Sequence, residues 1–127
     1  MANELVLIVE DNERNRRLAR DLLRIHGYRT IEAETGEDGV ALAAERTPDL
    51  VVMDIHLPGI SGIEALAKLR AVPASREIPV IAFTASVMPQ DRSEILAAGF
   101  DAFVSKPINL ESFLGAVAAA VAKAGAP

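Results

Sequence analysis

The chain of 127 residues contains no cysteine. It therefore offers no disulfide, no thiolate nucleophile and no cysteine-ligated zinc site, which is typical of a protein in a reducing compartment. It also lacks a positively charged leader, and its first apolar run, Leu5–Val9, is ended by Glu10 and Asp11. Neither a signal peptide nor a membrane span fits this start, so we expect a cytoplasmic protein without a membrane partner.

An excess of positive charge is absent as well. The sequence has 13 lysines and arginines against 18 acidic residues, a net charge of -5. Such a chain repels a polyphosphate backbone, so we expect no nucleic-acid partner. Its one basic cluster, Arg14, Arg16 and Arg17, lies among acids and is interpreted as a solvated helix face.

The composition and the apolar runs predict one α/β domain. The length suits one hydrophobic core, so we expect a single domain over residues 1–127 with a frayed tail at residues 122–127. Five apolar runs rich in β-branched residues predict strands: Leu5–Val9, Tyr28–Ala33, Leu50–Met53, Val80–Phe83 and Ala102–Val104. Enough residues separate them for crossover helices, which predicts five βα units and a parallel sheet covered on both faces.

The helices carry recognisable end signals and apolar faces. The first, at about Glu13–His26, is expected to bury one stripe and to end at Gly27. Thr35 and Ser61 open patterns that resemble capping boxes. The expected stripe is Leu18, Leu22 and Ile25, and the last helix, capped by Asn109, is expected to bury Leu110, Phe113, Leu114, Val117 and Val121.

Polar residues follow four of the five strands, directly after three of them and after a short step in the case of Lys106. They are Glu10 with Asp11, Asp54, Thr84 and Lys106, whereas the second strand, a natural edge strand, delivers none. Because ligands of open α/β sheets bind at the carboxyl ends of the strands, we expect these groups to share one rim. Two carboxylates about 4 Å apart repel by about 4 kcal/mol at an effective dielectric near 20, so the cluster requires a proton or a cation. Mg²⁺, which prefers oxygen ligands, is the natural answer.

Each of these residues also has a purely structural interpretation. Asp11 or Asn12 can cap the first helix, and Asp54 can begin a turn. Thr84 is an ordinary strand-end residue, and a single lysine such as Lys106 usually lies on the surface. The ordered combination at the ends of specific strands favours a functional site over these separate interpretations.

The combination resembles the receiver domain of two-component response regulators over essentially the whole chain. The motifs are Leu7-Ile8-Val9-Glu10-Asp11-Asn12, Met53-Asp54-Ile55-His56-Leu57-Pro58-Gly59-Ile60-Ser61-Gly62, Phe83-Thr84-Ala85, Phe103 and Ser105-Lys106-Pro107. The resemblance implies a flavodoxin-like three-layer sandwich with a five-stranded parallel sheet of order 2-1-3-4-5. Among receivers, Glu10-Asp11-Asn12 and the length are similar to the DivK-type cell-division regulators.

The resemblance also implies a chemistry. Asp54 would be the phosphoacceptor, and Mg²⁺, or Mn²⁺ in its place, would bind Asp11, Asp54 and the backbone carbonyl of His56. Glu10 stands where many receivers have aspartate, and it would act mainly through a metal-bound water. Lys106 would neutralise charge on the phosphoryl group. The chain would then be a phosphoacceptor that assists its own phosphorylation and dephosphorylation, and not an enzyme in the usual sense.

The same resemblance assigns the switch and the partners. Thr84 would bind the phosphoryl group and Phe103 would turn inward, which shifts the face formed by the fourth helix, fifth strand and fifth helix. Pro58, Gly62 and Pro107 would be structural, and the Lys106–Pro107 peptide bond is a candidate cis bond. A histidine kinase or histidine phosphotransferase would supply the phosphoryl group, and a separate effector protein would read it. We expect a monomer or a weak dimer.

Three other functions fit these residues less well. An aspartate-nucleophile phosphohydrolase would need a second acid beside Asp54, where Ile55 and His56 stand instead. A flavodoxin-like nucleotide or flavin module would need a loop rich in glycine, serine or threonine in place of Glu10 and its acidic neighbour. A receiver that signals without phosphorylation would not need the acids, threonine and lysine together.

Overall fold

The computed structural model describes residues 3–85, 89–106 and 108–124 and places in them five strands and five helices that alternate along the chain. The strands are β1 (Leu5–Val9), β2 (Arg29–Ala33), β3 (Leu50–Asp54), β4 (Val80–Thr84) and β5 (Ala102–Ser105). The helices are α1 (Glu13–Ile25), α2 (Gly36–Arg46), α3 (Gly62–Ala71), α4 (Pro89–Ala98) and α5 (Leu110–Ala124). The predicted order of five βα units is confirmed.

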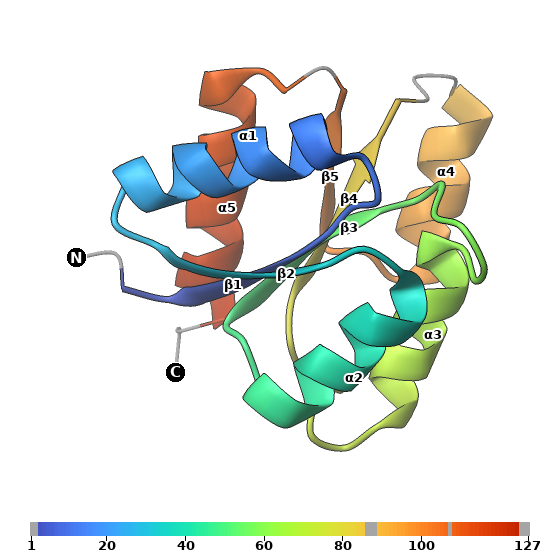
Figure 1. Ribbon diagram of the computed structural model, residues 1–127. Coiled ribbons are helices and arrows are strands. Elements are labelled where there is room, and N and C mark those ends of the chain that lie inside the picture. The colour runs from blue at the N-terminus through green and yellow to red at the C-terminus, as the bar shows by residue number, and fades with distance from the viewer. Residues whose placement is uncertain (1–2, 86–88, 107, 125–127) are drawn as a thin grey trace.

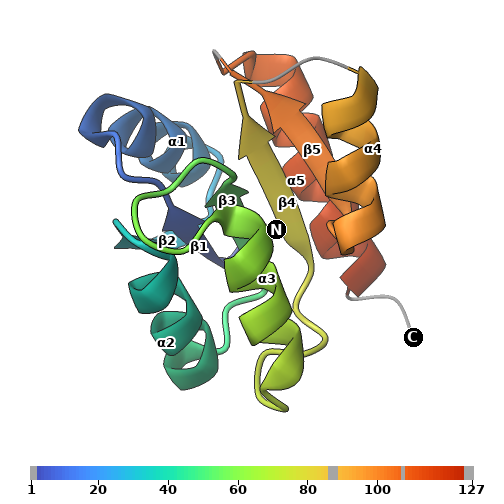
Figure 2. The same cartoon turned by 90° about the vertical axis from the view of Figure 1, so that its right-hand side faces the viewer.

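The five strands form one parallel sheet in the order β2-β1-β3-β4-β5, as expected. Helices α1 and α5 cover one face of the sheet, and α2, α3 and α4 cover the other (Figure 1). The view turned by 90° shows the carboxyl ends of the central strands at one edge of this sandwich (Figure 2). Because all strands run the same way, the residues that follow them meet at that edge.

Two hydrophobic clusters hold the layers together, one on each face of the sheet. Along β1, Val6 and Ile8 face α1 and α5, while Leu7 and Val9 face α2 and α3, and all four are fully buried. This alternation is the period-2 pattern of a strand, and burial on both faces explains why β1 is apolar throughout and why β3 and β4 are apolar up to their last residues, Asp54 and Thr84. The central strands therefore give the rim residues a rigid base.

The helix faces differ from the expected stripes. Leu18 and Ile25 were expected in the core, but they are 43% and 76% exposed. The core positions of α1 are instead Ala19 and Leu23, because a small residue allows the helix to lie close to the sheet. In α5, Leu110 is also 48% exposed. The predicted stripes were wrong at these three positions because large apolar side chains were favoured over the residues whose position around the helix axis faces the sheet.

Most predicted helix ends are confirmed. Gly27 adopts a positive φ of 90°, as its place after α1 indicates. Ser61 forms a reciprocal capping box with Glu64, whereas Thr35 caps α2 by accepting from one backbone N–H alone. Helix α5 extends to Ala124, so the tail does not begin at residue 122 as predicted. Within the described ranges, no helix has the length and apolar character needed to cross a bilayer.

Candidate functional site

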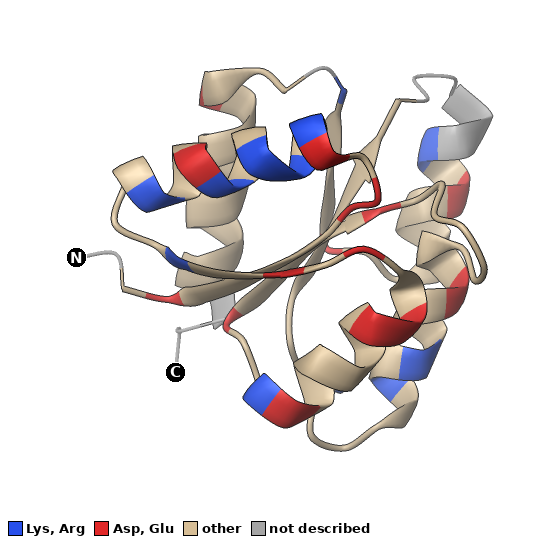
Figure 3. Ribbon diagram, in the orientation of Figure 1, with Lys and Arg blue, Asp and Glu red and all other residues tan. Residues whose placement is uncertain are grey.

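Three carboxylates meet at the carboxyl edge of the sheet. Glu10 and Asp11 directly follow β1, and Asp54 is the last residue of β3. One carboxylate oxygen from each lies within 4.8 Å of the others. Acidic positions gather at this edge where β1 leads into α1 (Figure 3). The pairing of β1 with β3 explains the meeting, since both strands end at the same height.

The three acids differ in their surroundings. Glu10 and Asp54 are 1% and 3% exposed, whereas Asp11 is exposed. The backbone N–H of Asn12 donates to Glu10 Oε2 over 3.1 Å, and Asn12 also caps α1 through its side chain. The expected cap is thus Asn12, which leaves the Asp11 carboxylate available to the cluster.

Lys106 lies between the two buried acids. Its Nζ is 2.8 Å from Glu10 Oε1 and 3.2 Å from Asp54 Oδ2. Its backbone N–H donates to the Thr84 carbonyl over 2.7 Å, which fixes the start of the segment after β5. Burial alone would lower the pKa of the lysine, but the carboxylates of Glu10 and Asp54 outweigh it and raise the pKa. The lysine therefore remains a cation beside the acids.

The donor set fits a divalent metal ion. Three carboxylates with one lysine leave excess negative charge at the cluster, and hard oxygen ligands are those that Mg²⁺ prefers. Glu10 Oε1 is buried, and the Lys106 ammonium, 2.8 Å away, is the cation that lies against it. Because this one ammonium is shared with Asp54, burying both carboxylates is costly unless a further cation or a proton offsets the remaining charge. The residues present therefore suit the group that the sequence predicted.

The loop after β3 is held tightly against Asp54. The His56 N–H donates to Asp54 Oδ1 over 3.1 Å, and the Gly62 N–H donates to the Ile55 carbonyl over 2.9 Å. A Cβ atom on Gly62 would lie 2.3 Å from the Asp54 carbonyl oxygen. The expected structural role of this glycine therefore has a direct steric reason. Pro58 lies exposed in the same loop, and Pro107 lies outside the described residues.

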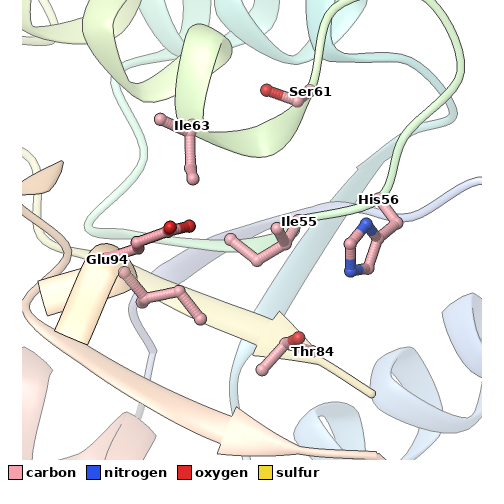
Figure 4. Close-up of a pocket in the computed structure, with 7 residues that line it drawn as sticks. Ile55, His56, Ser61, Ile63, Thr84 and Glu94 are labelled. Atoms are coloured by element: carbon pink, nitrogen blue, oxygen red, sulfur yellow. The ribbon is translucent and has the colours of Figure 1, made fainter. Parts of the chain in front are cut away.

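Thr84 ends β4 beside a cavity of about 210 Å³. The wall of this cavity consists of Ile55, His56, Ser61, Ile63, Thr84, Glu94 and Ile95 (Figure 4). Three isoleucines from the loop after β3, from α3 and from α4 form the apolar part of the wall, and Glu94 of α4 adds a carboxylate to its polar part. Thr84 is 1% exposed and thus lies at the wall between the core and the site.

Phe103, the predicted switch aromatic, is partly buried on β5. The guanidinium of Arg92, on α4, lies over its ring at 5.3 Å from the centroid. Such a stacked cation is attracted by the ring quadrupole. The ring is thus clamped between the sheet edge and α4 in this conformation, a contact for which the residue pattern carries no signal.

The contribution of β2 was not predicted. Glu34 directly follows this strand, so the expectation that the second strand delivers no polar group was wrong. Together with Glu32 it binds Arg16, whose side chain is only 13% exposed, whereas the cluster of Arg16 with Arg14 and Arg17 was interpreted as solvated. The signal available was the position of Glu34, one residue after the apolar run.

Burial of Glu10 has a consequence for stability. Desolvation raises the pKa of its carboxyl from 4.5 to about 7, although Lys106 and the Asn12 N–H act in the opposite direction. The folded protein then binds this proton more tightly than the unfolded chain does. The resulting stability is fully present below pH 4.5 and is lost as the pH rises through about 7.

We therefore expect Glu10→Gln to increase the stability of the metal-free protein relative to the unchanged protein as the pH rises. The free energy of unfolding of the variant minus that of the unchanged protein should increase between pH 5 and about 7. Urea unfolding followed by circular dichroism measures this difference. A constant difference across that window would show that Glu10 titrates at its ordinary pKa.

The sequence of the chain matches a known protein family and its members. The family model described as the response regulator receiver domain matches residues 6–118. The polar-differentiation response regulator DivK of Brucella ovis is 46% identical over 109 residues, which cover 86% of this chain and 89% of that protein. The segment matched by the family model contains every residue of the acidic cluster, Thr84 and Lys106.

Solved structures agree with the sequence match. A putative response regulator from Chloroflexus aurantiacus J-10-fl superposes with a TM-score of 0.90 at 25% identity, covering 94% of this chain and 98% of that one. The receiver domain of the sensor histidine kinase PA1611 from Pseudomonas aeruginosa PAO1 has a TM-score of 0.88 at 30% identity, with 95% and 99% covered. That receiver is described with a magnesium ion coordinated in its active-site cleft.

Proposed function

Because the chain belongs to the response regulator receiver family, we propose that it is a signalling switch in which Asp54 accepts a phosphoryl group. One observation carries this proposal: a buried aspartate at the end of β3 shares its surroundings with two further acids and one lysine. A carboxylate oxygen of Asp54 would form the new bond to phosphorus as the phosphorus–nitrogen bond of a phosphohistidine breaks. The released imidazole nitrogen takes up a proton.

The metal proposal follows from the same geometry. Asp11 and Asp54, with the backbone carbonyl of His56, would hold Mg²⁺ or Mn²⁺, and Glu10 would act mainly through a bound water. The PA1611 receiver, with magnesium in its cleft, supports this assignment. When bound, the ion supplies positive charge that offsets the acids and the phosphoryl oxygens. The carboxylates and the loop after β3 orient that charge relative to Asp54.

Lys106 and Thr84 are proposed to read the product. The lysine lies within 3.2 Å of Asp54 Oδ2 and can pair with a phosphoryl oxygen, and the Thr84 hydroxyl can donate to another. A shift from about 1:99 to 99:1 between two states needs about 5.5 kcal/mol, whereas one charge-assisted hydrogen bond contributes about 1.5 to 3 kcal/mol. Both residues must therefore act together with a packing change, which we assign to Phe103.

The partners follow from the family. A histidine kinase or histidine phosphotransferase supplies the phosphoryl group in this proposal, and α4, β5 and α5 present the result to a separate effector or pass the group onward. We place the reaction in the cytoplasm and the protein among monomers or weak dimers. The role is that of a phosphoacceptor assisting its own labelling and hydrolysis, and no nucleic acid or membrane takes part.

The proposal is tested by labelling with acetyl phosphate. We expect a stoichiometric, acid-labile and hydroxylamine-sensitive label with Mg²⁺ or Mn²⁺, and loss of labelling when the ion is removed with EDTA. Intact mass spectrometry measures the label. Labelling that is indifferent to the ion, or steady turnover of small phosphomonoesters, would contradict the switch, and turnover would favour the phosphohydrolase.

Two variants separate acceptance of the phosphoryl group from its consequences. Thr84→Ala and Lys106→Ala should still accept some label, but phosphorylation should no longer change the structure at α4, β5 and α5. In two-dimensional NMR spectra, amides of β5 and α5 should shift on phosphorylation of the unchanged protein and remain in place in both variants. Full shifts in either variant would remove that residue from the switch.

A further inference from the structure

Arg16, on the first turns of α1, reaches the main chain of the acidic cluster. Its Nη1 donates to the Glu10 carbonyl oxygen over 2.9 Å. That carbonyl belongs to the peptide unit that joins Glu10 to Asp11. The guanidinium therefore contacts neither a carboxylate of the cluster nor its lysine, but the backbone from which two of the three acids project.

The same guanidinium also contacts acids in and directly after the edge strand β2. Nε of Arg16 lies 3.2 Å from Glu32 Oε1, and Nη1 lies 3.8 Å from Glu34 Oε1. The side chains of Arg16 and Glu32 are 13% and 26% exposed, so this pair is shielded from solvent more than a typical surface pair, whereas Glu34 is 71% exposed and its contact is solvated. The planar fork of a guanidinium can bind several acceptors at once in a fixed geometry. Arg16 thereby ties the β1–α1 turn to β2.

Asp11 is the residue that depends most on this tie. Within the described part of the chain, no hydrogen bond or ion pair is seen at its exposed carboxylate, so the backbone places the Cα–Cβ bond about which this side chain rotates. The turn is held on one side by the Glu10 N–H, which donates to the Ala33 carbonyl over 3.0 Å. On the other side, Arg16 holds the carbonyl oxygen of the Glu10–Asp11 peptide.

We infer that Arg16 is a positioning residue for the divalent metal ion, acting through the Glu10 carbonyl and supported by Glu32 of β2 and by Glu34 directly after it. This inference rests on the proposed magnesium site. Outer contacts that orient metal ligands typically change affinity by about 10- to 100-fold when they are removed. The edge strand, which offers no ligand itself, thus contributes to the site through one arginine.

Arg20 provides a matched control on the same helix. It lies 3.7 Å from Glu32 Oε2 and 3.2 Å from Asp21 Oδ1, and it does not contact the Glu10 carbonyl. Arg16→Ala and Arg20→Ala each remove one arginine that pairs with Glu32, so general loss of charge or stability should affect both. Only the first variant releases the Glu10–Asp11 peptide.

Calorimetric titration of the metal-free protein with MgCl₂ at pH 7 tests the inference. We expect the dissociation constant to rise at least about tenfold in Arg16→Ala and to stay within about twofold in Arg20→Ala. Arg16→Lys, which keeps one donor, should recover part of the affinity. Labelling of Arg16→Ala by acetyl phosphate should approach the unchanged rate at saturating Mg²⁺, because the acceptor itself is intact.

The outcomes separate this inference from the function on which it rests. Unchanged protein that binds no Mg²⁺ would refute the proposed site. Unchanged protein that binds, together with an Arg16→Ala variant of equal affinity, would refute the positioning role alone. Equal weakening in both arginine variants, matched by equal losses in urea unfolding, would also refute it, because it would show general destabilisation.

Discussion

Asp54→Asn is expected to abolish labelling by acetyl phosphate or a histidine kinase. The amide cannot act as the oxygen nucleophile, and no other acid of the cluster occupies its place at the end of β3. The fold should survive, because the amide oxygen introduced in place of Asp54 Oδ1 can still accept from the His56 N–H, and Lys106 keeps Glu10 as its partner. Intact mass spectrometry should therefore show no added phosphoryl mass.

Asp38→Asn is the control for this substitution. Asp38 is exposed in the first turn of α2, so the same chemical change there should leave labelling unchanged. Far-ultraviolet circular dichroism verifies that both variants are folded. Labelling of Asp54→Asn at the unchanged extent would place the acceptor on another residue and would remove the basis of the proposed switch.

Gly62→Ala is expected to destabilise the protein by about 2 to 3 kcal/mol. The added Cβ would lie 2.3 Å from the Asp54 carbonyl oxygen and 2.8 Å from Ile55 Cα, and both are backbone atoms that cannot rotate away. The helix α3 or the loop after β3 must therefore move, and the Asp54 carboxylate moves with it. Urea unfolding measures the loss of stability, and the labelling rate should fall in the same variant.

Gly115→Ala is the matched control, since Gly115 lies inside α5 and an added Cβ would meet nothing within 4 Å. Alanine is favoured over glycine in a helix interior by about 1 kcal/mol, so this variant should be as stable as the unchanged protein or more so. If the two variants have the same stability, close contact with the Asp54 backbone is not what requires glycine at position 62.

The sequence was sufficient for the sheet and for the rim residues. Apolar runs bounded by polar residues are local signals, and parallel pairing then forces Glu10, Asp54 and Thr84 to one edge. Helix faces were less predictable, because Leu18 and Ala19 are neighbours in the helix and the apolar pattern alone favoured the larger one. The close approach that a buried alanine permits is a property of packing.

The contacts of Arg16 and of Phe103 could not be predicted for a different reason. Arg16 and Glu32 lie far apart in the sequence, and their pairing depends on how α1 leans over the edge strand. The contact between Arg92 and Phe103 likewise depends on the angle between α4 and β5. Neither angle follows from local residue preferences, although both contacts adjust the surroundings of the predicted site.

The place of Lys106 between Glu10 and Asp54 has a consequence for the approach of phosphodonors. Three ionised carboxylates and one ammonium leave two negative charges, which a single divalent ion balances. With the divalent ion bound, the site that an anionic donor approaches is nearly neutral. Long-range attraction or repulsion then contributes little to the encounter, and the rate of transfer from a small donor should depend only weakly on ionic strength.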